Sequence, residues 1–261
     1  MHMATIDKQS LALEYHESSK VFSGLQLSFT SNTEYKIYPN TKATQMTKNN
    51  LGTLTSGDDN FIKALLLRKS TRSFAPRGVG FDSLSKLLTL SCGMQNARDN
   101  EPWARTYASA GARFPIETYA VILSSDEMEL GIYHHNIPDN TLELVKAGDY
   151  SEEVNSFYSN QIGQVITKFP CLILFSVILD RTMQMYGERG YRFAMLDAGH
   201  MSQNLYLVAS YLKLGIVALG GGVESDSKLD EMLRILPNEE SVFFGFAVGH
   251  PAECNVESTD A

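Results

Sequence analysis

A long helical pattern in the C-terminal half of the chain is the feature that most constrains its fold. After Arg192, apolar residues recur every three or four positions, as on one face of a helix: Ala194, Ala198, Met201, Leu205, Val208 and Leu212. A turn with two glycines precedes it, Tyr186-Gly187-Glu188-Arg189-Gly190-Tyr191-Arg192. The same helix carries Asp197, His200, Gln203 and Asn204. Because buried polar groups are costly unless each finds a partner, this helix belongs to a core with a polar network or to a functional site.

The composition is that of a globular protein with one large domain or two small ones. Of 261 residues, 43% are hydrophobic and 20% are charged. The net charge of −8 argues against nucleic acid or an anionic membrane as the main partner, since both require a basic face. We expect no signal peptide and no membrane span, because no apolar run reaches about 18 residues. The three cysteines, Cys92, Cys171 and Cys254, lack metal-ligand spacing and favour a reduced, cytoplasmic protein.

The remaining patterns predict an α+β fold rather than a doubly wound sheet, because helices and strands are not in regular alternation. We expect helices over 60–69, 81–92 and 227–236, with Asp82 or Ser83 capping the second and Gly215 ending the long helix. Residues 118–123 and 131–133 predict a hairpin, 171–178 a central strand buried on both faces, and 241–248 a last strand. The segment 139–169 is expected to be mainly helical, 33–38 a short strand and 39–59 a loop.

Three segments could carry chemistry. Arg68-Lys69-Ser70-Thr71-Arg72-Ser73-Phe74 places cations and hydroxyls where a phosphate or a polarised carbonyl could bind; the alternative is a solvated basic helix end. Tyr107 to Pro115 is a run of small residues between aromatics, which lets the backbone approach a planar ligand or simply forms a tight turn. Leu219-Gly220-Gly221-Gly222-Val223 leaves amide groups open to an acceptor atom, or is a flexible turn. It does not match a dinucleotide fingerprint.

The other candidates are weaker. His134 and His135 are adjacent, so on a strand they face opposite ways and cannot hold one metal together; no metal site is expected. His200 is best interpreted as a core histidine. Ser109 lacks the Gly-x-Ser-x-Gly context of a nucleophilic serine.

In their order and spacing, these segments resemble the FMN-dependent nitroreductase superfamily, and most closely its SagB-type branch, the azoline dehydrogenases of peptide natural-product biosynthesis. The resemblance covers about residues 60–251. It rests on Arg68-Lys69-Ser70-x-Arg72-x-Phe74, Tyr107-x-Ser109-Ala110-Gly111-Ala112-Arg113-Phe114-Pro115, Arg181-Thr182, Tyr186-Gly187-x-Arg189-Gly190-Tyr191-Arg192, Asp197-Ala198-Gly199-His200 with Gln203-Asn204-Leu205, Gly220-Gly221, and Ala247-Val248-Gly249-His250-Pro251. Tyr15-His16-Glu17-x-Ser19-Lys20 is similar to the lead-in of that branch.

The resemblance implies a mainly antiparallel sheet flanked by helices, in an intertwined homodimer with FMN at the subunit interface. Residues 1–59 would be an N-terminal extension, 60–253 the FMN-binding domain and 254–261 a tail. Arg68 and Ser70 would meet the phosphate and ribityl chain, and Arg72 the flavin N1/O2 edge, where a cation stabilises the reduced form. Ser109 to Gly111 would line the ring, and amides near Gly220 and Gly221 would face N5. The full set of implied cofactor residues is Arg68, Lys69, Ser70, Arg72, Ser109, Ala110, Gly111, Gln203, Asn204, Leu219, Gly220 and Gly221, with Tyr186 and Glu188 catalytic.

One departure from the branch affects the activity. A Lys-Tyr pair is expected before the Gly-x-Arg-Gly-Tyr-Arg run, and this chain has Met185-Tyr186. An ammonium beside a tyrosine favours its phenolate form and can shuttle a proton, and methionine does neither. Three functions therefore stay open: dehydrogenation of a peptide-derived azoline to an azole, with O₂ reoxidising the flavin; a generic NAD(P)H-dependent nitro or quinone reductase; and a weakly catalytic scaffold subunit of a biosynthetic complex.

Overall fold

A six-stranded antiparallel sheet organises the computed structural model, which describes residues 10–19, 60–95, 104–158, 166, 168–219 and 225–252. The strand order is β3-β2-β1-β4-β6-β5, and every neighbouring pair is antiparallel. The strands are β1 (Ile116–Ile122), β2 (Gly131–Asn136), β3 (Thr141–Ala147), β4 (Cys171–Val177), β5 (Gly215–Leu219) and β6 (Ser241–Gly249). The helices are α1 (Leu11–Ser19), α2 (Asn60–Leu67), α3 (Phe81–Cys92), α4 (Ser151–Tyr158), α5 (Asp180–Tyr186), α6 (Arg189–Tyr211) and α7 (Ser225–Leu233), with a short 3₁₀ turn η1 (Ala110–Ala112).

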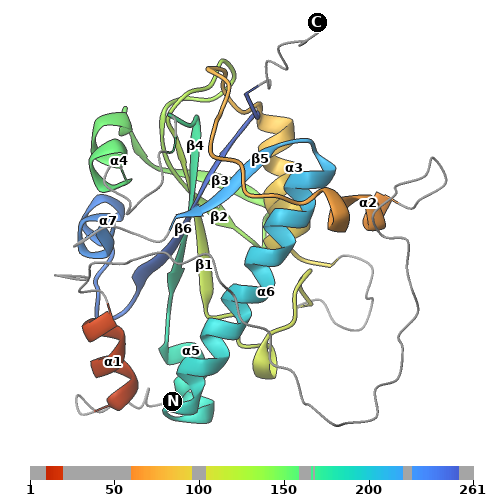
Figure 1. Cartoon of the computed structure of the whole chain (residues 1–261). Helices are drawn as coiled ribbons and strands as arrows, with labels where there is room; N and C mark the ends of the chain where they lie inside the picture. Colours follow the sequence, from red (N-terminus) through yellow and green to blue (C-terminus); the bar gives the residue numbers. More distant parts are fainter. Residues whose placement is uncertain are drawn as a thin grey trace, which may run out of the picture.

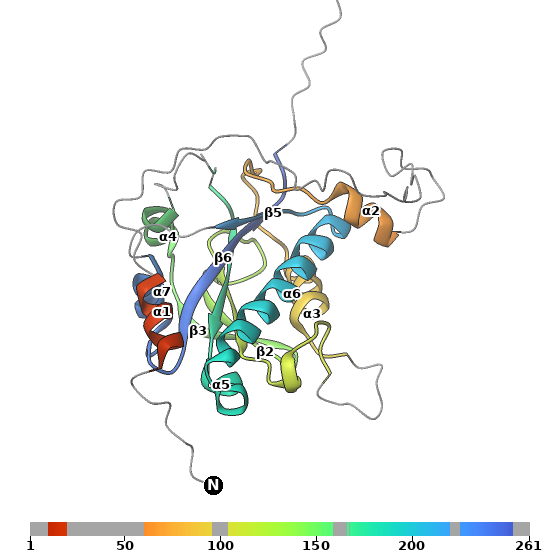
Figure 2. The ribbon, with the colours of Figure 1, turned by 60° about the horizontal axis from the view of Figure 1, so that its bottom comes forward.

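Strand β4 lies between β1 and β6 and is buried along its whole length, as its continuous apolar run predicts. Its alternate side chains enter two separate cores. Ile173 and Phe175 face the cluster that contains α3 and α6, whereas Leu172 and Leu174 face the cluster with α4 and α7. Figures 1 and 2 both show α3 and α6 on one side of the sheet and α4 and α7 on the other. The sheet therefore has both faces covered.

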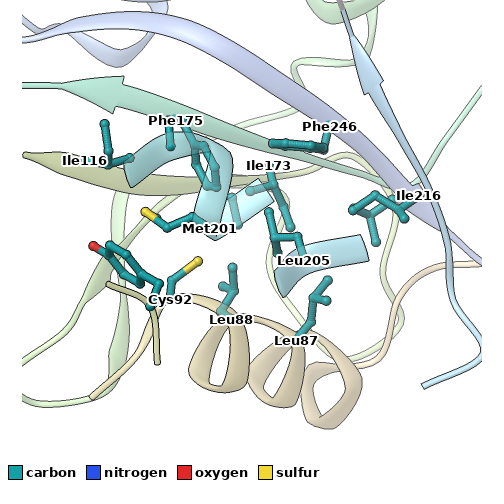
Figure 3. Packing of buried hydrophobic residues seen from close by; sticks show 14 of the residues in the cluster. Leu87, Leu88, Cys92, Ile116, Ile173, Phe175, Met201, Leu205, Ile216 and Phe246 are labelled. Carbon is teal, nitrogen blue, oxygen red and sulfur yellow. The ribbon is translucent and has the colours of Figure 1, made fainter. Parts of the chain in front are cut away.

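Helix α6 is the central element of the first core. Met201 and Leu205 lie between Leu87 and Leu88 of α3 and the β4 and β6 side chains of the sheet (Figure 3). Full burial of one such apolar side chain contributes roughly 1.5–3 kcal/mol to stability. The periodic pattern found in the sequence is the face that makes these contacts. The helix begins at Arg189, five residues before the first residue of the pattern, Ala194.

Most expected elements are confirmed, including the β1–β2 hairpin and the exact bounds of α3. Three details are wrong. The segment 139–169 contains strand β3 before the short helix α4, because β3 pairs with β2 at the sheet edge. Gly215 starts β5, and Lys213, with a φ of 59°, makes the left-handed turn after α6. Neither Asp82 nor Ser83 caps α3; Glu127 Oε2 instead accepts a hydrogen bond from Phe81 N at 2.7 Å.

Some expectations lie outside the described residues, namely the strand 33–38 and the loop 39–59. Among the cysteines, Cys92 and Cys171 are free and buried, and burial raises the pKa of each thiol to about 12. Within the described part of the chain, no helix has the length and apolar character needed to cross a bilayer.

Candidate functional site

The basic segment 68–73 follows α2 directly and lies against the edge strand β5. Thr71 N donates a hydrogen bond to Ile216 O at 2.9 Å. A Cβ on Gly215 would lie 2.7 Å from Thr71 Cγ2, so glycine is needed at 215 for this close approach. The edge strand therefore fixes the segment that the sequence predicts to bind phosphate. Arg68, Lys69 and Arg72 are exposed on it.

Tyr206 of α6 connects this segment to the sheet. Its hydroxyl accepts a hydrogen bond from Ala218 N at 2.8 Å and lies 3.5 Å from Ser70 Oγ. The guanidinium of Arg68 lies 5.4 Å from the centroid of the Tyr206 ring. Sequence analysis did not identify Tyr206. Its only signal is a position one residue beyond the Gln203-Asn204-Leu205 run, on the partly buried flank of α6.

A small cavity of about 180 Å³ lies beside this segment, between the ends of α2 and α6 and β5. Its polar lining consists of Lys69, Thr71, Tyr206, Ser210 and Lys213. Two ammonium groups and three hydroxyls form a donor set suited to an anion, and the size suits a phosphate group rather than a whole nucleotide. Lys213 was not predicted, because its arrival here depends on how α6 ends.

The second segment is anchored at the middle of α6. Ser109 Oγ donates a hydrogen bond to Asp197 Oδ2 at 2.5 Å and accepts one from Phe114 N at 2.9 Å. Burial raises the pKa of Asp197, and the Ser109 hydrogen bond opposes that rise. Gly111 takes the left-handed conformation with a φ of 60°. The Ser109 side chain is thus engaged within the chain. Residues 111–113 form the exposed part of the turn, whereas Ser109 and Ala110 are partly buried.

Two further α6 side chains hold the same segment. Asn204 Nδ2 donates to Ser91 O at 3.3 Å and Thr106 O at 3.1 Å, and His200 Nδ1 lies 3.0 Å from Ala108 O. His200 is exposed, so the interpretation of it as a core histidine is wrong. The polar residues on the long helix form a network that positions the 104–114 segment. Gln203 is exposed on the same helix.

The candidate catalytic residue Tyr186 lies against Gly111. A Cβ on Gly111 would lie 2.6 Å from Tyr186 Oη and 3.1 Å from Met185 Sδ. Arg113 reaches the same place, with its Nε 3.4 Å and its Nη2 3.5 Å from Met185 Sδ. The Tyr186 ring packs edge-on against Phe193 at 4.8 Å. The Tyr186 hydroxyl and the Met185 thioether therefore lie beside Gly111, and the Arg113 guanidinium lies beside the thioether. Sequence analysis did not give Arg113 a role of its own, although it lies in the quoted motif.

Glu188 has a different environment. Its Oε2 accepts a hydrogen bond from Ala12 N at 2.6 Å, at the N-terminus of α1. This carboxylate therefore holds the N-terminus of α1. The catalytic role expected for Glu188 stays a prediction.

The other predicted residues divide into those described and those not. Leu219 is buried at the end of β5, and Gly220 and Gly221 lie outside the described residues. His134 and His135 face opposite ways, as predicted: His134 contacts Glu117 and Glu143, and His135 is buried. Among the described residues, no group of three metal-ligating side chains is present.

The two anchor points on α6 bring the predicted segments onto one helix. Tyr206, beside Ser70, and Asp197, beside Ser109, are nine positions apart, which is about 14 Å along the helix axis. A sequence model of the nitroreductase family matches residues 65–250, the region that contains both segments. The chain belongs to the nitroreductase family. As a member it is a flavin oxidoreductase.

Several known proteins are similar to this chain in sequence. The chain is 28% identical to a nitroreductase-type protein of Methanocaldococcus jannaschii over 66% of this chain and 82% of that protein. It is 28% identical to the microcin B17-processing protein McbC of Escherichia coli over 55% of this chain and 56% of McbC. It is 25% identical to the FMN reductase (NADPH) of Bacillus subtilis over 74% of this chain and 67% of that protein.

The fold is shared with a structure of the E. coli microcin synthetase McbBCD complex with truncated pro-MccB17 bound. The TM-score is 0.72 at 18% identity, with 93% of this chain and 94% of the matched chain covered. Identity this low shows the fold alone. It confirms the nitroreductase-like α+β architecture expected from the sequence.

Proposed function

We propose that this nitroreductase-family protein is an FMN-dependent dehydrogenase that converts an azoline ring of a peptide-derived substrate to an azole in natural-product biosynthesis. The observation that carries the proposal is the contact between the Tyr186 hydroxyl and Gly111. A proton-handling side chain beside the segment expected to line the flavin ring is what a dehydrogenation requires. The sequence similarity to McbC, named as a microcin B17-processing protein, supports a peptide substrate.

The residues around β5 fit the phosphate end of FMN. The cavity of about 180 Å³ is lined by Lys69, Lys213, Thr71 and Ser210. Ser70 and Arg68 both contact Tyr206, which also lines this cavity. We propose that these residues hold the phosphate and that Arg72 contributes its positive charge to the flavin. When bound, FMN would supply the acceptor for the hydride equivalent that leaves the substrate.

The chain's own residues would handle the proton. Oxidation of an azoline to an azole removes one hydride equivalent and one proton from the ring, a loss of 2 Da. In this proposal Tyr186, in its phenolate form, accepts the proton, and Arg113 provides a fixed positive charge nearby. Stabilisation of charge that develops during the reaction is commonly a large part of catalysis.

We further propose a homodimer, for which exposed apolar side chains give the support. Phe61 and Leu67 of α2 and Leu196 and Tyr211 of α6 are each 57–59% exposed. Helix α2 packs beside the C-terminal part of α6, as Figures 1 and 2 show. Exposed apolar side chains on two packed helices support an interaction surface there. A second copy covering these helices would complete the dimer that the resemblance implies.

A second candidate is an NAD(P)H-dependent nitro or quinone reductase, and Met185 is the observation that favours it. Methionine at 185 removes the ammonium that the azoline-oxidising branch is expected to carry. The similarity to an FMN reductase (NADPH) supports the same alternative.

The deciding experiment incubates the flavin-loaded protein with synthetic thiazoline- and oxazoline-containing peptides and follows mass. A loss of 2 Da that the Tyr186→Phe variant slows by about 10²–10⁴ supports azoline dehydrogenation. Rapid anaerobic bleaching of the flavin by NAD(P)H, without any loss of mass from the peptides, supports the reductase. Absence of both activities would assign the chain a scaffold role.

A further inference from the structure

A groove of about 610 Å³ lies between α1 and the first turn of α6. Leu11, Ala12 and Tyr15 form the α1 wall, and the other wall consists of Glu188, Arg189, Tyr191 and Arg192. This groove is distinct from the cavity with Lys69 and Lys213. Tyr191 lines the groove and Ser210 lines the cavity. The two residues are nineteen positions apart, about 28 Å along α6.

The α1 wall is fixed on α6 by specific contacts. Ala12 N donates to Glu188 Oε2 at 2.6 Å, and Leu13 N donates to Ser10 Oγ at 3.4 Å, as at a capped helix start. The rings of Tyr15 and His16 pack edge-on against Tyr191, with centroid distances of 5.7 and 5.9 Å. These contacts leave Leu11 and Tyr15 72% and 63% exposed toward solvent.

The groove has two arginines among its lining residues, on a chain whose net charge is −8. Arg189 and Arg192 are both exposed at its rim. The carboxylate in the groove, Glu188, is occupied by the N-terminus of α1, which carries a partial positive charge. Two guanidinium groups beside apolar and aromatic side chains match a ligand with both carboxylate and apolar groups, because arginine pairs with carboxylates in a bidentate manner.

The groove also begins next to the candidate catalytic residue. Tyr186 ends α5, Gly187 turns the chain with a φ of 55°, and Glu188 is the first groove residue. The end of the groove at Glu188 is therefore two residues along the chain from Tyr186.

We propose that this groove binds a segment of the substrate peptide that flanks the reacting ring. An acidic residue of that segment pairs with Arg189 and Arg192, and an apolar residue lies against Leu11 and Tyr15. Only the identity of the ligand as a substrate rests on the proposed function. Recognition of an acidic, apolar peptide by the groove does not depend on any redox activity.

The test uses two fluorescein-labelled synthetic decapeptides, both with central Phe and Leu residues. They differ at two positions only, which are Glu in one peptide and Gln in the other. Fluorescence anisotropy with the full-length, flavin-loaded protein gives both affinities. We expect the Glu peptide to bind at least tenfold more tightly, and added salt to reduce this preference. The double variant Arg189→Gln/Arg192→Gln should lose the preference. A charge-matched control, Lys86→Gln/Lys146→Gln, removes two cations from outside the groove and should keep it.

Equal affinities for the two peptides, no binding of the Glu peptide at millimolar concentration, or an unchanged preference in the arginine variant would overturn the proposal. Tyr15→Ala, which changes the opposite wall, should weaken both peptides severalfold and leave the Glu preference intact. This variant keeps the test valid if the arginine variant does not fold. Peptide selectivity without any loss of 2 Da would leave the groove standing and reject azoline dehydrogenation.

Discussion

The Sδ atom of Met185 lies 3.4 Å from Nε and 3.5 Å from Nη2 of Arg113. The two residues are 72 positions apart and meet beside Gly111 and the Tyr186 hydroxyl. The resemblance to azoline dehydrogenases predicts a lysine at 185. A lysine ammonium at that point would face the Arg113 guanidinium, and the two positive charges would repel each other. The neutral side chain of methionine avoids this repulsion. Arg113 can supply a positive charge here, but it cannot shuttle a proton, because a guanidinium stays protonated.

Replacement of Arg113 should therefore reduce turnover. For Arg113→Gln we expect kcat on an azoline peptide to fall about tenfold or more, because a charge near the reacting atoms is lost. The bound-flavin absorption spectrum should not change. Arg77→Gln is the matched control, since the Arg77 guanidinium contacts the His250 ring rather than Met185. An unchanged kcat in Arg113→Gln would remove Arg113 from the proposed mechanism.

The contact at Gly111 can be tested by adding one methyl group. In Gly111→Ala the new Cβ would lie 2.6 Å from Tyr186 Oη, in a backbone with a φ of 60°. We expect a loss of about 1–3 kcal/mol in the free energy of unfolding and a marked fall in kcat. Urea denaturation and steady-state kinetics measure the two effects.

Gly199→Ala serves as the control for that substitution. Gly199 is exposed in α6, and nothing lies within 4 Å of an added Cβ. Alanine is a better helix former, so the stability should rise by up to about 1 kcal/mol. If both alanine variants behave alike, the close contact at Gly111 is not what matters.

Glu188→Gln should weaken the attachment of α1. The carboxylate accepts a hydrogen bond at a helix N-terminus, where loss of a charged acceptor costs about 0.5–2 kcal/mol. We expect faster limited proteolysis within residues 10–19. If proteolysis is unchanged while kcat falls strongly, Glu188 acts in catalysis, as the sequence predicts.

The phosphate-binding proposal predicts a specific loss of cofactor affinity. Lys213→Gln and Lys69→Gln should each raise the Kd for FMN about fivefold to fiftyfold, because each removes a charge-assisted hydrogen bond. Fluorescence quenching of added FMN measures the affinity. Lys86→Gln, on the exposed side of α3, should have no effect. Riboflavin, which lacks the phosphate, should bind all of these proteins alike.

The pair Glu117–His134 should make stability depend on pH. The hydrogen bond to Glu117 raises the pKa of His134 above its ordinary value of 6.5, although burial opposes the rise. His134 therefore stabilises the fold fully below about pH 6.5 and loses this effect as pH rises through its raised folded pKa. For Glu117, burial acts to raise the pKa, but the bond from His134 and the charge of Arg181 outweigh it, and the pKa is lowered from 4.5. Its contribution is present above pH 4.5 and is lost as pH falls through the lowered folded value.

We expect the difference in stability between wild type and His134→Gln to shrink between about pH 6 and pH 8. The group is partly exposed, so the change should be about 1 kcal/mol or less. Thermal unfolding at several pH values measures it. A difference that does not vary with pH would show that Glu117 does not shift the pKa of His134 on folding.

The local sequence was sufficient for elements that bury a continuous or periodic apolar face. The run in β4 and the repeat in α6 each predicted an element that the structure confirms, because burial is a property of the residues themselves. The helical prediction for 139–169 was wrong in its first part, where burial gives no such signal. Strand β3 is largely exposed at the sheet edge, so its residues bury no apolar face that would mark it as a strand.

The amino-acid sequence alone establishes the segments, their order and their chemistry: a basic stretch at 68–72, a small-residue turn at 107–115 and a polar helix after 186. Which of these side chains meet is visible only in the folded chain. Lys213 joins Lys69 because α6 ends in a left-handed turn before β5, and Tyr186 and Met185 approach the 109–113 turn closely because Gly111 lacks a side chain. Contacts between residues far apart in the chain depend on packing of whole elements, and no local pattern encodes that packing.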